Sequence, residues 1–340
     1  MRILGIESTA HTFGAAIIDD ATILSNENEA MRVPDSGLIP VRIAEHHVAV
    51  CRATIERALT KAKTDIRDVE LIAVSTEPGM GHALRVGAIC AKALSYRFSI
   101  PLMGVNHSLA HLTSALTFID DERVTLLYVA GANTQIWNYD RYLALTGETL
   151  DIGLGHLLDL VARDLGAGFP GGPVIERLAA QSDTLIELPY SVKGMDVTYG
   201  GLSTKLRQLI ATDKEHGRLD NARQASLAYS LQEHAFAMML EACERAIALN
   251  DSTVLGVIGG VALNERFTRM ARVLCDERGC GFFVPDRALL ADNAGMIALE
   301  GARRALNGEA SEPFREGSSL TIDPYARVPA RFPYERFQRR

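Results

Sequence analysis

Two histidines four residues apart, His107 and His111, have the spacing in this chain that most directly suggests chemistry. They follow an apolar run, Pro101–Val105, that predicts a buried strand, and Asn106, a residue type that commonly caps a helix. Residues four apart on a helix share one face at a Cβ separation of about 6 Å, so both imidazoles can bind one metal ion. Two histidines leave positions open for further ligands, as catalytic metal sites do. Such pairs also occur on helix surfaces that bind no metal.

Glycine turns at the ends of strands are the second feature that suggests a functional site: Gly131, Gly171-Gly172 and Gly259-Gly260. Glycine lets backbone N–H groups approach phosphate oxygens, and helix N-termini add a favourable dipole. Three such turns in one chain favour a nucleotide site. The chain contains neither the phosphate-loop motif nor the dinucleotide-binding fingerprint, so neither of those two folds is indicated.

Polar side chains near these turns have two readings. Asp159 and Glu176 flank the PGGP turn and are candidates for hydrogen bonds to ribose hydroxyls, while Asp292 is a candidate oxygen ligand for the metal. Asn264 ends the GGVALN turn. The alternative for each is a helix cap or a solvated charge, and the residues alone leave it open.

The elements that must position these residues alternate between strand and helix. A hairpin, one or more helices, and a strand followed by a glycine turn and a helix occur twice, which predicts two related α/β lobes; one doubly wound sheet is the alternative. The expected strands are Arg2–Ile6, Phe13–Ile18, Leu71–Ser75, Pro101–Val105, Thr125–Val129, Thr134–Tyr139 and Val254–Ile258, and the expected helices are 41–63, 83–96, 224–249 and 265–274.

The composition is that of a folded protein with two lobes. The chain has 340 residues, is 47% hydrophobic and 23% charged, and has a net charge of −7, which excludes a uniformly basic nucleic-acid binder. Its five cysteines show no paired spacing, no signal peptide is evident, and no apolar run approaches the roughly 20 residues that span a bilayer. We therefore expect a cytoplasmic protein with reduced thiols.

The expected domains are an N-terminal lobe, residues 1–120, and a C-terminal lobe, residues 121–292. A helix near residues 293–308 is expected to pack back on the first lobe. The Gly- and Pro-rich stretch 166–204 predicts functional loops. The arginine-rich end, residues 325–340, predicts a poorly ordered basic tail.

Nine motifs together resemble one family, the universal tRNA adenosine threonylcarbamoyltransferases, in the form found as the catalytic subunit of the archaeal and eukaryotic KEOPS complex. The resemblance covers about residues 1–324. The motifs occur in the family's order: GIESTAHTFG, PGMGHALRVG, GVNHSLAH, YVAGANTQ, GETLDIGLGHLLD, FPGGPVIERLA, LPYSVKGMD, GGVALNERF and DNAGMIA.

The resemblance implies a two-lobed actin-like ATPase (ASKHA) fold with a central cleft. It also implies transfer of the threonylcarbamoyl group from L-threonylcarbamoyladenylate to the exocyclic amine of the adenosine beside the anticodon, in tRNAs that read codons beginning with A. One divalent ion, iron(II) or zinc, would be held by His107, His111, Tyr128 and Asp292. The acyl-adenylate would contact Tyr128, Val129, Ala130, Gly131 and Ala132, and its adenosine would contact Asp159, Gly172, Glu176 and Asn264. The implied partners are tRNA, a kinase-like ATPase, a dimerising subunit and a tRNA-binding subunit.

Departures from the family's motifs keep two alternatives open. Ala130 stands where serine is common, Ile39 and Val41 replace a histidine and an arginine, and Glu77 precedes a Pro-Gly turn near the phosphate region. These changes motivate a non-catalytic nucleotide-binding paralogue. The other alternative is a carbamoyl-type transferase that acts on another acceptor, because related ASKHA carbamoyltransferases share a histidine pair.

Overall fold

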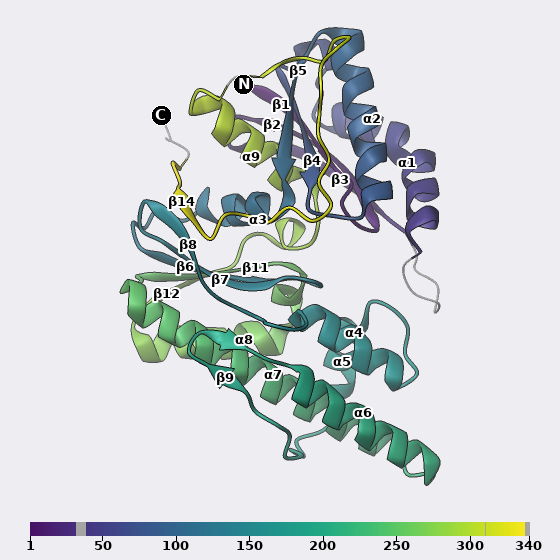
Figure 1. Ribbon diagram of the computed structural model, residues 1–340, viewed down its shortest axis with the longest axis vertical. Coiled ribbons are helices and arrows are strands. Elements are labelled where there is room, and N and C mark those ends of the chain that lie inside the picture. Colours follow the sequence, from purple (N-terminus) through teal and green to yellow (C-terminus); the bar gives the residue numbers. More distant parts are fainter. Residues whose placement is uncertain (32–38, 310, 337–340) are drawn as a thin grey trace. The chain divides into compact units, whose positions relative to one another are not determined.

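The computed structural model describes residues 1–31, 39–309 and 311–336, and these form two compact units. The first unit contains Met1–Asp120, Pro285–Pro329 and the chain from Tyr334; the second contains Asp121–Val284 and Ala330–Pro333. Each unit has one six-stranded sheet. Figure 1 labels the strands and helices used below.

The first sheet has the order β13-β5-β4-β1-β2-β3. Strands β1 to β3 are antiparallel neighbours, whereas β4 and β5 continue from β1 in parallel. Its strands are β1 (Arg2–Glu7), β2 (Thr12–Asp19), β3 (Thr22–Ala30), β4 (Leu71–Glu77), β5 (Pro101–Asn106) and β13 (Glu312–Pro313).

Helices cover both faces of this sheet because alternate residues of its strands are apolar on both sides. Ile3 packs in a core with α3 and α9, whereas its neighbour Leu4 packs in a core with α1 and α2. The helix α9 approaches β1 so closely that a Cβ on Gly5 would lie 2.9 Å from the Cβ of Ala298. The helices are α1 (Pro40–Lys61), α2 (Gly81–Phe98), α3 (His107–Leu116) and α9 (Ala294–Leu306), with the short turns η1 (Ile66–Asp68) and η3 (Arg287–Leu289).

The second sheet repeats the arrangement of the first. Its order is β12-β11-β6-β7-β8-β14, with β6 to β8 antiparallel and with β11 and β12 parallel to β6. Its strands are β6 (Val124–Val129), β7 (Thr134–Tyr139), β8 (Tyr142–Glu148), β11 (Val254–Ile258), β12 (Gly281–Phe283) and β14 (Arg331–Pro333). The repeated α/β organisation expected from the sequence is thus confirmed.

The helices of the second unit follow the glycine turns. They are α4 (Leu154–Asp164), α5 (Gly171–Ala179), α6 (Gly200–Glu215), α7 (Asn221–Asn250) and α8 (Glu265–Arg278), with the turn η2 (Gly260–Leu263) and a small hairpin of β9 (Val192–Lys193) and β10 (Asp196–Val197). No helix in the described ranges is long and apolar enough to cross a membrane.

Three expectations need correction. The stretch 166–204 is not all loop, because it contains α5 and the start of α6. Residues 285–292 belong to the first unit instead of the second. The arginine-rich end is ordered as far as the structure describes it: β14 pairs with β8, and Tyr334 is 2% exposed. Residues 337–340, and residues 32–38 before Ile39, lie outside the described residues.

Candidate metal and nucleotide sites

Three polar side chains of the first unit converge at the start of α3. The Nε2 atoms of His107 and His111 each lie 3.5 Å from Oδ1 of Asp292. The two rings are nearly perpendicular, with centroids 4.8 Å apart. One ligand atom from each of the three residues lies within 4.8 Å of the other two. The helix spacing places the two imidazoles together, and the turn before α9 adds the carboxylate.

A fourth residue, Glu7 at the end of β1, orients the first histidine. Its Oε2 lies 3.0 Å from Nδ1 of His107, and its Oε1 accepts hydrogen bonds from the backbone and the hydroxyl of Thr9, the former at 2.6 Å. Glu7 is fully buried. A carboxylate that accepts the proton of one ring nitrogen leaves the other nitrogen free to bind a metal, which is the usual arrangement behind a metal-bound histidine.

The buried ionisable groups of this cluster shift one another's pKa values. Burial disfavours the protonated ring of His107, but the carboxylates of Glu7 and Asp292 outweigh it and raise the pKa of His107 to about 9. Burial lowers the pKa of His111. Burial opposes ionisation of Asp292 as well, yet the two histidines hold the pKa of this carboxyl well below its usual range. The carboxylates thus favour the charged form of His107, and the histidines favour the charged form of Asp292.

The N-terminus of α3 is fixed by a cap. Asn106 accepts a hydrogen bond from the N–H of Leu109 at 3.0 Å, as the sequence predicts. The amide of Asn106 in turn donates to Glu77 at 3.3 Å. Glu77, which departs from the family's motif, therefore supports the helix that carries both histidines.

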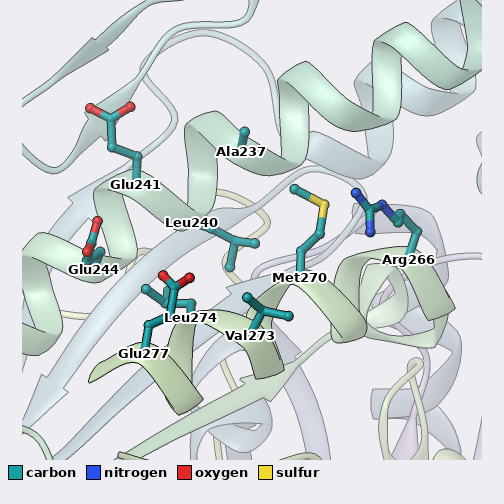
Figure 2. Close-up of a pocket in the computed structure, with 9 residues that line it drawn as sticks. All are labelled: Ala237, Leu240, Glu241, Glu244, Arg266, Met270, Val273, Leu274 and Glu277. Carbon is teal, nitrogen blue, oxygen red and sulfur yellow. The ribbon is translucent and has the colours of Figure 1, made fainter. Parts of the chain in front are cut away.

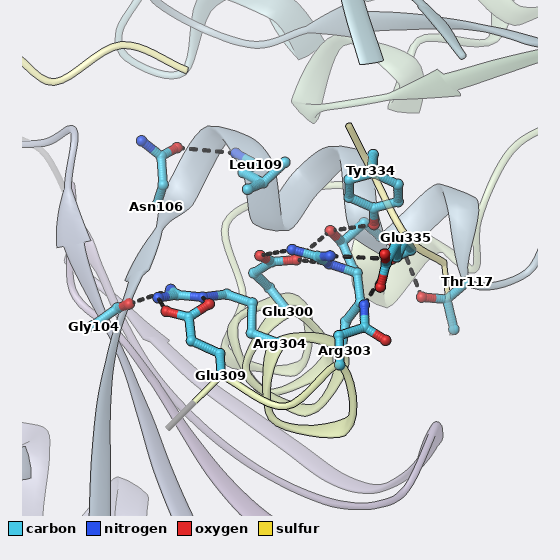
Figure 3. Close-up of polar contacts among 12 residues, drawn as sticks. Gly104, Asn106, Leu109, Thr117, Glu300, Arg303, Arg304, Glu309, Tyr334 and Glu335 are labelled. Carbon is cyan, nitrogen blue, oxygen red and sulfur yellow. Dashed lines mark hydrogen bonds and ion pairs between the residues drawn. The ribbon is translucent and has the colours of Figure 1, made fainter. Parts of the chain in front are cut away.

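The other side of α3 is held by a buried polar network (Figure 3). The hydroxyl of Thr113, two residues after His111, donates to Glu300 of α9 at 2.5 Å and lies 2.7 Å from the hydroxyl of Tyr334. Glu300 is fully buried and also accepts two hydrogen bonds from Arg303, at 2.8 and 2.7 Å. The chain end thus anchors the histidine helix.

Two imidazoles and one carboxylate form a donor set that suits zinc or non-haem iron(II). The buried Glu7 behind His107 strengthens the fit, because a metal-bound histidine usually donates its other ring N–H to such a carboxylate. The remaining expected ligand, Tyr128, lies in β6 of the second unit, where its side chain is 1% exposed. Its metal-binding role stays a prediction.

The expected nucleotide contacts of the second unit gather at the turn between β6 and β7. Val129 is buried, Ala130 is half-buried, and Gly131 and Ala132 are exposed. A Cβ on Gly155 would lie 2.8 Å from the Ala130 carbonyl oxygen, and one on Gly153 would lie 2.6 Å from that of Ala132. A Cβ on Gly131 would meet nothing within 4 Å. The glycines of α4 therefore bring the helix against the turn, while Gly131 borders open space.

The other expected adenosine contacts also serve the fold. Asp159 accepts a hydrogen bond from the N–H of Gly171 at 2.7 Å, so it holds the start of α5 beside Gly172. Glu176 accepts from the N–H of Glu265 at 2.7 Å. Asn264 caps α8 by accepting from Phe267 at 3.0 Å, and its amide donates to Gln232 at 2.7 Å. The capping alternative is therefore realised at Asn264.

The sequence reasoning missed Glu7, Thr113 and Tyr334 as parts of this site. Glu7 had a detectable signal, because a lone acid that ends a buried apolar strand requires a partner. Thr113 and Tyr334 gave none, since their partners come from distant parts of the chain.

Known proteins resemble this chain over most of its length. The family model described as tRNA N6-adenosine threonylcarbamoyltransferase matches residues 22–299. A protein of that name from Thermococcus sibiricus is 43% identical and covers 89% of this chain and 91% of its own; one from Thermofilum pendens is 40% identical and covers 96% and 95%. A "probable bifunctional tRNA threonylcarbamoyladenosine biosynthesis protein" from Thermoplasma acidophilum is 41% identical, and the match covers 88% of this chain and 55% of that protein.

Solved structures show the fold. The HypF protein of T. kodakarensis superposes on 91% of this chain and 48% of its own with a TM-score of 0.60 at 14% identity. The activator of the 2-hydroxyisocaproyl-CoA dehydratase from Clostridium difficile covers 90% of this chain and 97% of its own with a TM-score of 0.51 at 14% identity. Together with the two repeated sheets, these likenesses identify an actin-like ATPase fold.

Proposed function

Because the chain belongs to the tRNA N6-adenosine threonylcarbamoyltransferase family, we propose that it transfers a threonylcarbamoyl group from L-threonylcarbamoyladenylate to tRNA. The acceptor is the exocyclic amine of the adenosine beside the anticodon, in tRNAs that read codons beginning with A. The supporting observation is the convergence of His107, His111 and Asp292 at the start of α3 with Glu7 behind them.

The reaction needs activation of the donor because the acceptor is a weak nucleophile. The lone pair of an aromatic amine is delocalised into the purine ring. The amine nitrogen attacks the carbamoyl carbon, the bond from that carbon to the phosphate oxygen breaks, AMP leaves with the electron pair, and the amine loses one proton. AMP is already a good leaving group, so no covalent enzyme intermediate is required. Correct alignment of donor and acceptor can remove about 7–11 kcal/mol of the barrier.

The histidine cluster would hold one iron(II) or zinc ion through His107, His111 and Asp292, with Tyr128 as the further ligand. When bound, the ion supplies a Lewis acid that polarises the carbonyl or phosphate group of the donor. Glu7 keeps the Nδ1 proton of His107 in place, and the Thr113 network keeps the helix fixed. Both contacts reduce the reorganisation that ligand binding would otherwise require.

The acyl-adenylate would occupy the β6–β7 turn of the second unit. The open space at Gly131 leaves room for a phosphate next to the backbone of Gly131 and Ala132. Gly172, Asp159, Glu176 and Asn264 would border the adenosine. Since Asp159 and Asn264 already accept hydrogen bonds from backbone N–H groups, they would hold the starts of α5 and α8 in place as well as contact the nucleoside.

We also propose that the protein works with separate subunits in the cytoplasm: a kinase-like ATPase, a dimerising subunit and a tRNA-binding subunit. Two features support this assignment. The Thermoplasma acidophilum relative is named bifunctional and extends well beyond the matched region, whereas this chain contains no kinase motif set. A chain with a net charge of −7 would also gain tRNA affinity from basic partners.

Reconstitution tests the proposal. Threonine, bicarbonate, ATP, the synthase that makes the adenylate, the partner subunits and unmodified tRNA are combined, and the modified nucleoside is measured by mass spectrometry. We expect product with the wild-type chain and none above background with His107→Ala. The control is His234→Ala, whose ring contacts only the Ser230 carbonyl of its own helix among the hydrogen bonds of the second unit.

Other outcomes identify the alternatives. Tight binding of the adenylate without product would support a non-catalytic paralogue. A threonylcarbamoyl or carbamoyl product on an acceptor other than tRNA would support a carbamoyl-type transferase that acts on another acceptor. Loss of product in His107→Ala without loss of bound metal would contradict the assigned ligand set.

A further inference from the structure

A groove of about 540 Å³ lies along α6 and the start of α7 in the second unit. One face of α6 supplies Lys205, Gln208, Leu209 and Thr212, which follow helical spacing. Asp213, Arg218 and Arg223 complete the lining. The groove therefore contains three cationic side chains and one carboxylate, in a chain whose net charge is −7.

The single carboxylate fixes the two arginines. Asp213 is buried, with its side chain 8% exposed. Its Oδ2 accepts from Nε of Arg223 at 2.7 Å, and its Oδ1 lies 3.4 Å from Nε of Arg218. Each guanidinium meets Asp213 through Nε, which leaves the terminal nitrogens, with most of its N–H donors, for a further ligand. The side chain of Arg218 is 60% exposed, so its donors are accessible.

Lys205 adds a third, exposed charge. It has no ion pair within the described parts of the chain. Two other cations of α6 do not line the groove: Arg207 pairs with Asp164 at 2.7 Å, and Lys214 donates to the Asp164 carbonyl at 2.6 Å. Lys205, Arg218 and Arg223 are therefore the cations that this groove offers to an anion.

A second groove of this unit has the opposite character (Figure 2). It measures about 350 Å³, lies between α7 and α8, and has an apolar floor that includes Leu240, Met270 and Val273. Its edge carries three glutamates, Glu241, Glu244 and Glu277. Its one arginine, Arg266, is neutralised by two hydrogen bonds to Glu233. This groove would repel phosphate, so the two grooves differ in the partner that their charge selects.

We propose that the α6–α7 groove binds the phosphodiester backbone of the substrate tRNA. The inference rests on the proposed function, which makes tRNA the polyanion that this chain must bind. Guanidinium groups recognise phosphate oxygens through paired N–H donors, and Lys205 adds a point charge. Gln208 and Thr212 provide neutral donors along the same face. No side chain of the groove is aromatic, so the groove offers no surface on which a base can stack.

The test compares two double variants with equal charge loss in the full-length chain. Lys205→Gln/Arg218→Gln removes the two most exposed cations of the groove. Lys63→Gln/Arg269→Gln removes one exposed lysine just after α1 and one exposed arginine on α8. Binding of unmodified tRNA is measured by fluorescence anisotropy between 50 and 200 mM salt, and thermal melting verifies that both variants are folded.

We expect the groove variant to bind tRNA about tenfold or more weakly at low salt, and the slope of log K against log salt to fall by about 2, as the loss of two phosphate contacts predicts. The control variant should match the wild-type chain in both quantities. Arg218→Lys, which keeps the charge, should retain most of the affinity. Equal affinity and slope in the two double variants, or no tRNA binding by the wild-type chain, would overturn the proposal.

Turnover separates this inference from the proposed function. If the groove binds tRNA, the variant should show a raised KM for tRNA with kcat nearly unchanged at saturating tRNA. Product formation with an unchanged KM would refute the groove while leaving the transferase function intact. Weaker tRNA binding by the groove variant, together with absence of product from the wild-type chain, would refute the transferase function while leaving the groove as an RNA contact.

Discussion

The carboxylate of Glu7 lies 3.0 Å from Nδ1 of His107, so the opposite nitrogen of the ring, Nε2, faces Asp292. The two residues come from different elements, the end of β1 and the start of α3. This contact decides which ring nitrogen of His107 is available to a ligand.

Replacement of Glu7 should therefore weaken metal binding without removing a ligand. We expect Glu7→Ala to lower the affinity for zinc or iron(II) by about 10- to 100-fold, as is usual when the partner behind a metal-bound histidine is lost. Glu7→Gln should lose less, because its amide oxygen can still accept from Nδ1. Metal titration by calorimetry measures the effect, and Glu45→Gln on the exposed face of α1 is the control. Wild-type affinity in Glu7→Ala would show that the contact serves the fold only.

Replacing one partner of the Glu300–Arg303 ion pair should lower the stability of the folded protein. Arg303→Met leaves the fully buried Glu300 without its cation and should destabilise the protein by about 3–5 kcal/mol. Tyr334→Phe removes the hydroxyl that lies 2.7 Å from the Thr113 hydroxyl and should cost about 1 kcal/mol. Chemical denaturation measures both. A double variant, Glu300→Leu/Arg303→Met, should recover much of the loss; if it is less stable than Arg303→Met, an isolated buried charge is not the cause.

His47 should make the stability of the protein depend on pH. It is fully buried in α1, edge-on to Phe13 at 5.6 Å, and burial is the main cause that lowers its pKa to about 4. The unfolded chain takes up a proton near pH 6.5 but the folded chain does not, so its stabilisation is present above pH 6.5 and is lost as the pH falls towards 4. The loss is on the order of 3 kcal/mol.

Denaturation at pH 7 and pH 4.5 measures this effect. His47→Leu should reduce the difference between the two pH values, whereas His216→Leu, at an exposed position, should leave it unchanged. The same difference in His47→Leu as in the wild-type chain would assign the acid sensitivity to other groups.

Gly131 and Gly155 should respond differently to alanine. A Cβ at Gly155 would press against the Ala130 carbonyl oxygen, so Gly155→Ala should destabilise the protein by about 1–3 kcal/mol. A Cβ at Gly131 meets no protein atom within 4 Å, so Gly131→Ala should leave stability unchanged.

Nucleotide binding separates the two glycines further. If the phosphate lies beside Gly131, Gly131→Ala should bind AMP or a stable adenylate analogue at least about tenfold more weakly, because the new methyl group occupies the space of the ligand. Calorimetric titration measures this, and Gly201→Ala at the start of α6 is the control. Unchanged affinity in Gly131→Ala would place the phosphate elsewhere.

The sequence by itself determined the local features. The helical spacing of His107 and His111, the cap at Asn106 and the apolar runs of the strands depend only on neighbouring residues, and the structure has them as expected. The repeated pattern also predicted two related α/β units, because each hairpin and each strand–turn–helix carries its own signals. What the histidines and glycines bind came from the family's motifs, not from the spacing alone.

Only the tertiary structure decided which distant residues meet. Glu7 reaches His107 because β1 and β5 lie in one sheet and α3 follows β5, and no local pattern encodes that packing. The arginine-rich end appeared disordered by composition, yet backbone pairing with β8 and the burial of Tyr334 outweigh its charge. Periodicity reports which face of an element is buried, whereas partner choice depends on the shapes of all elements packed together.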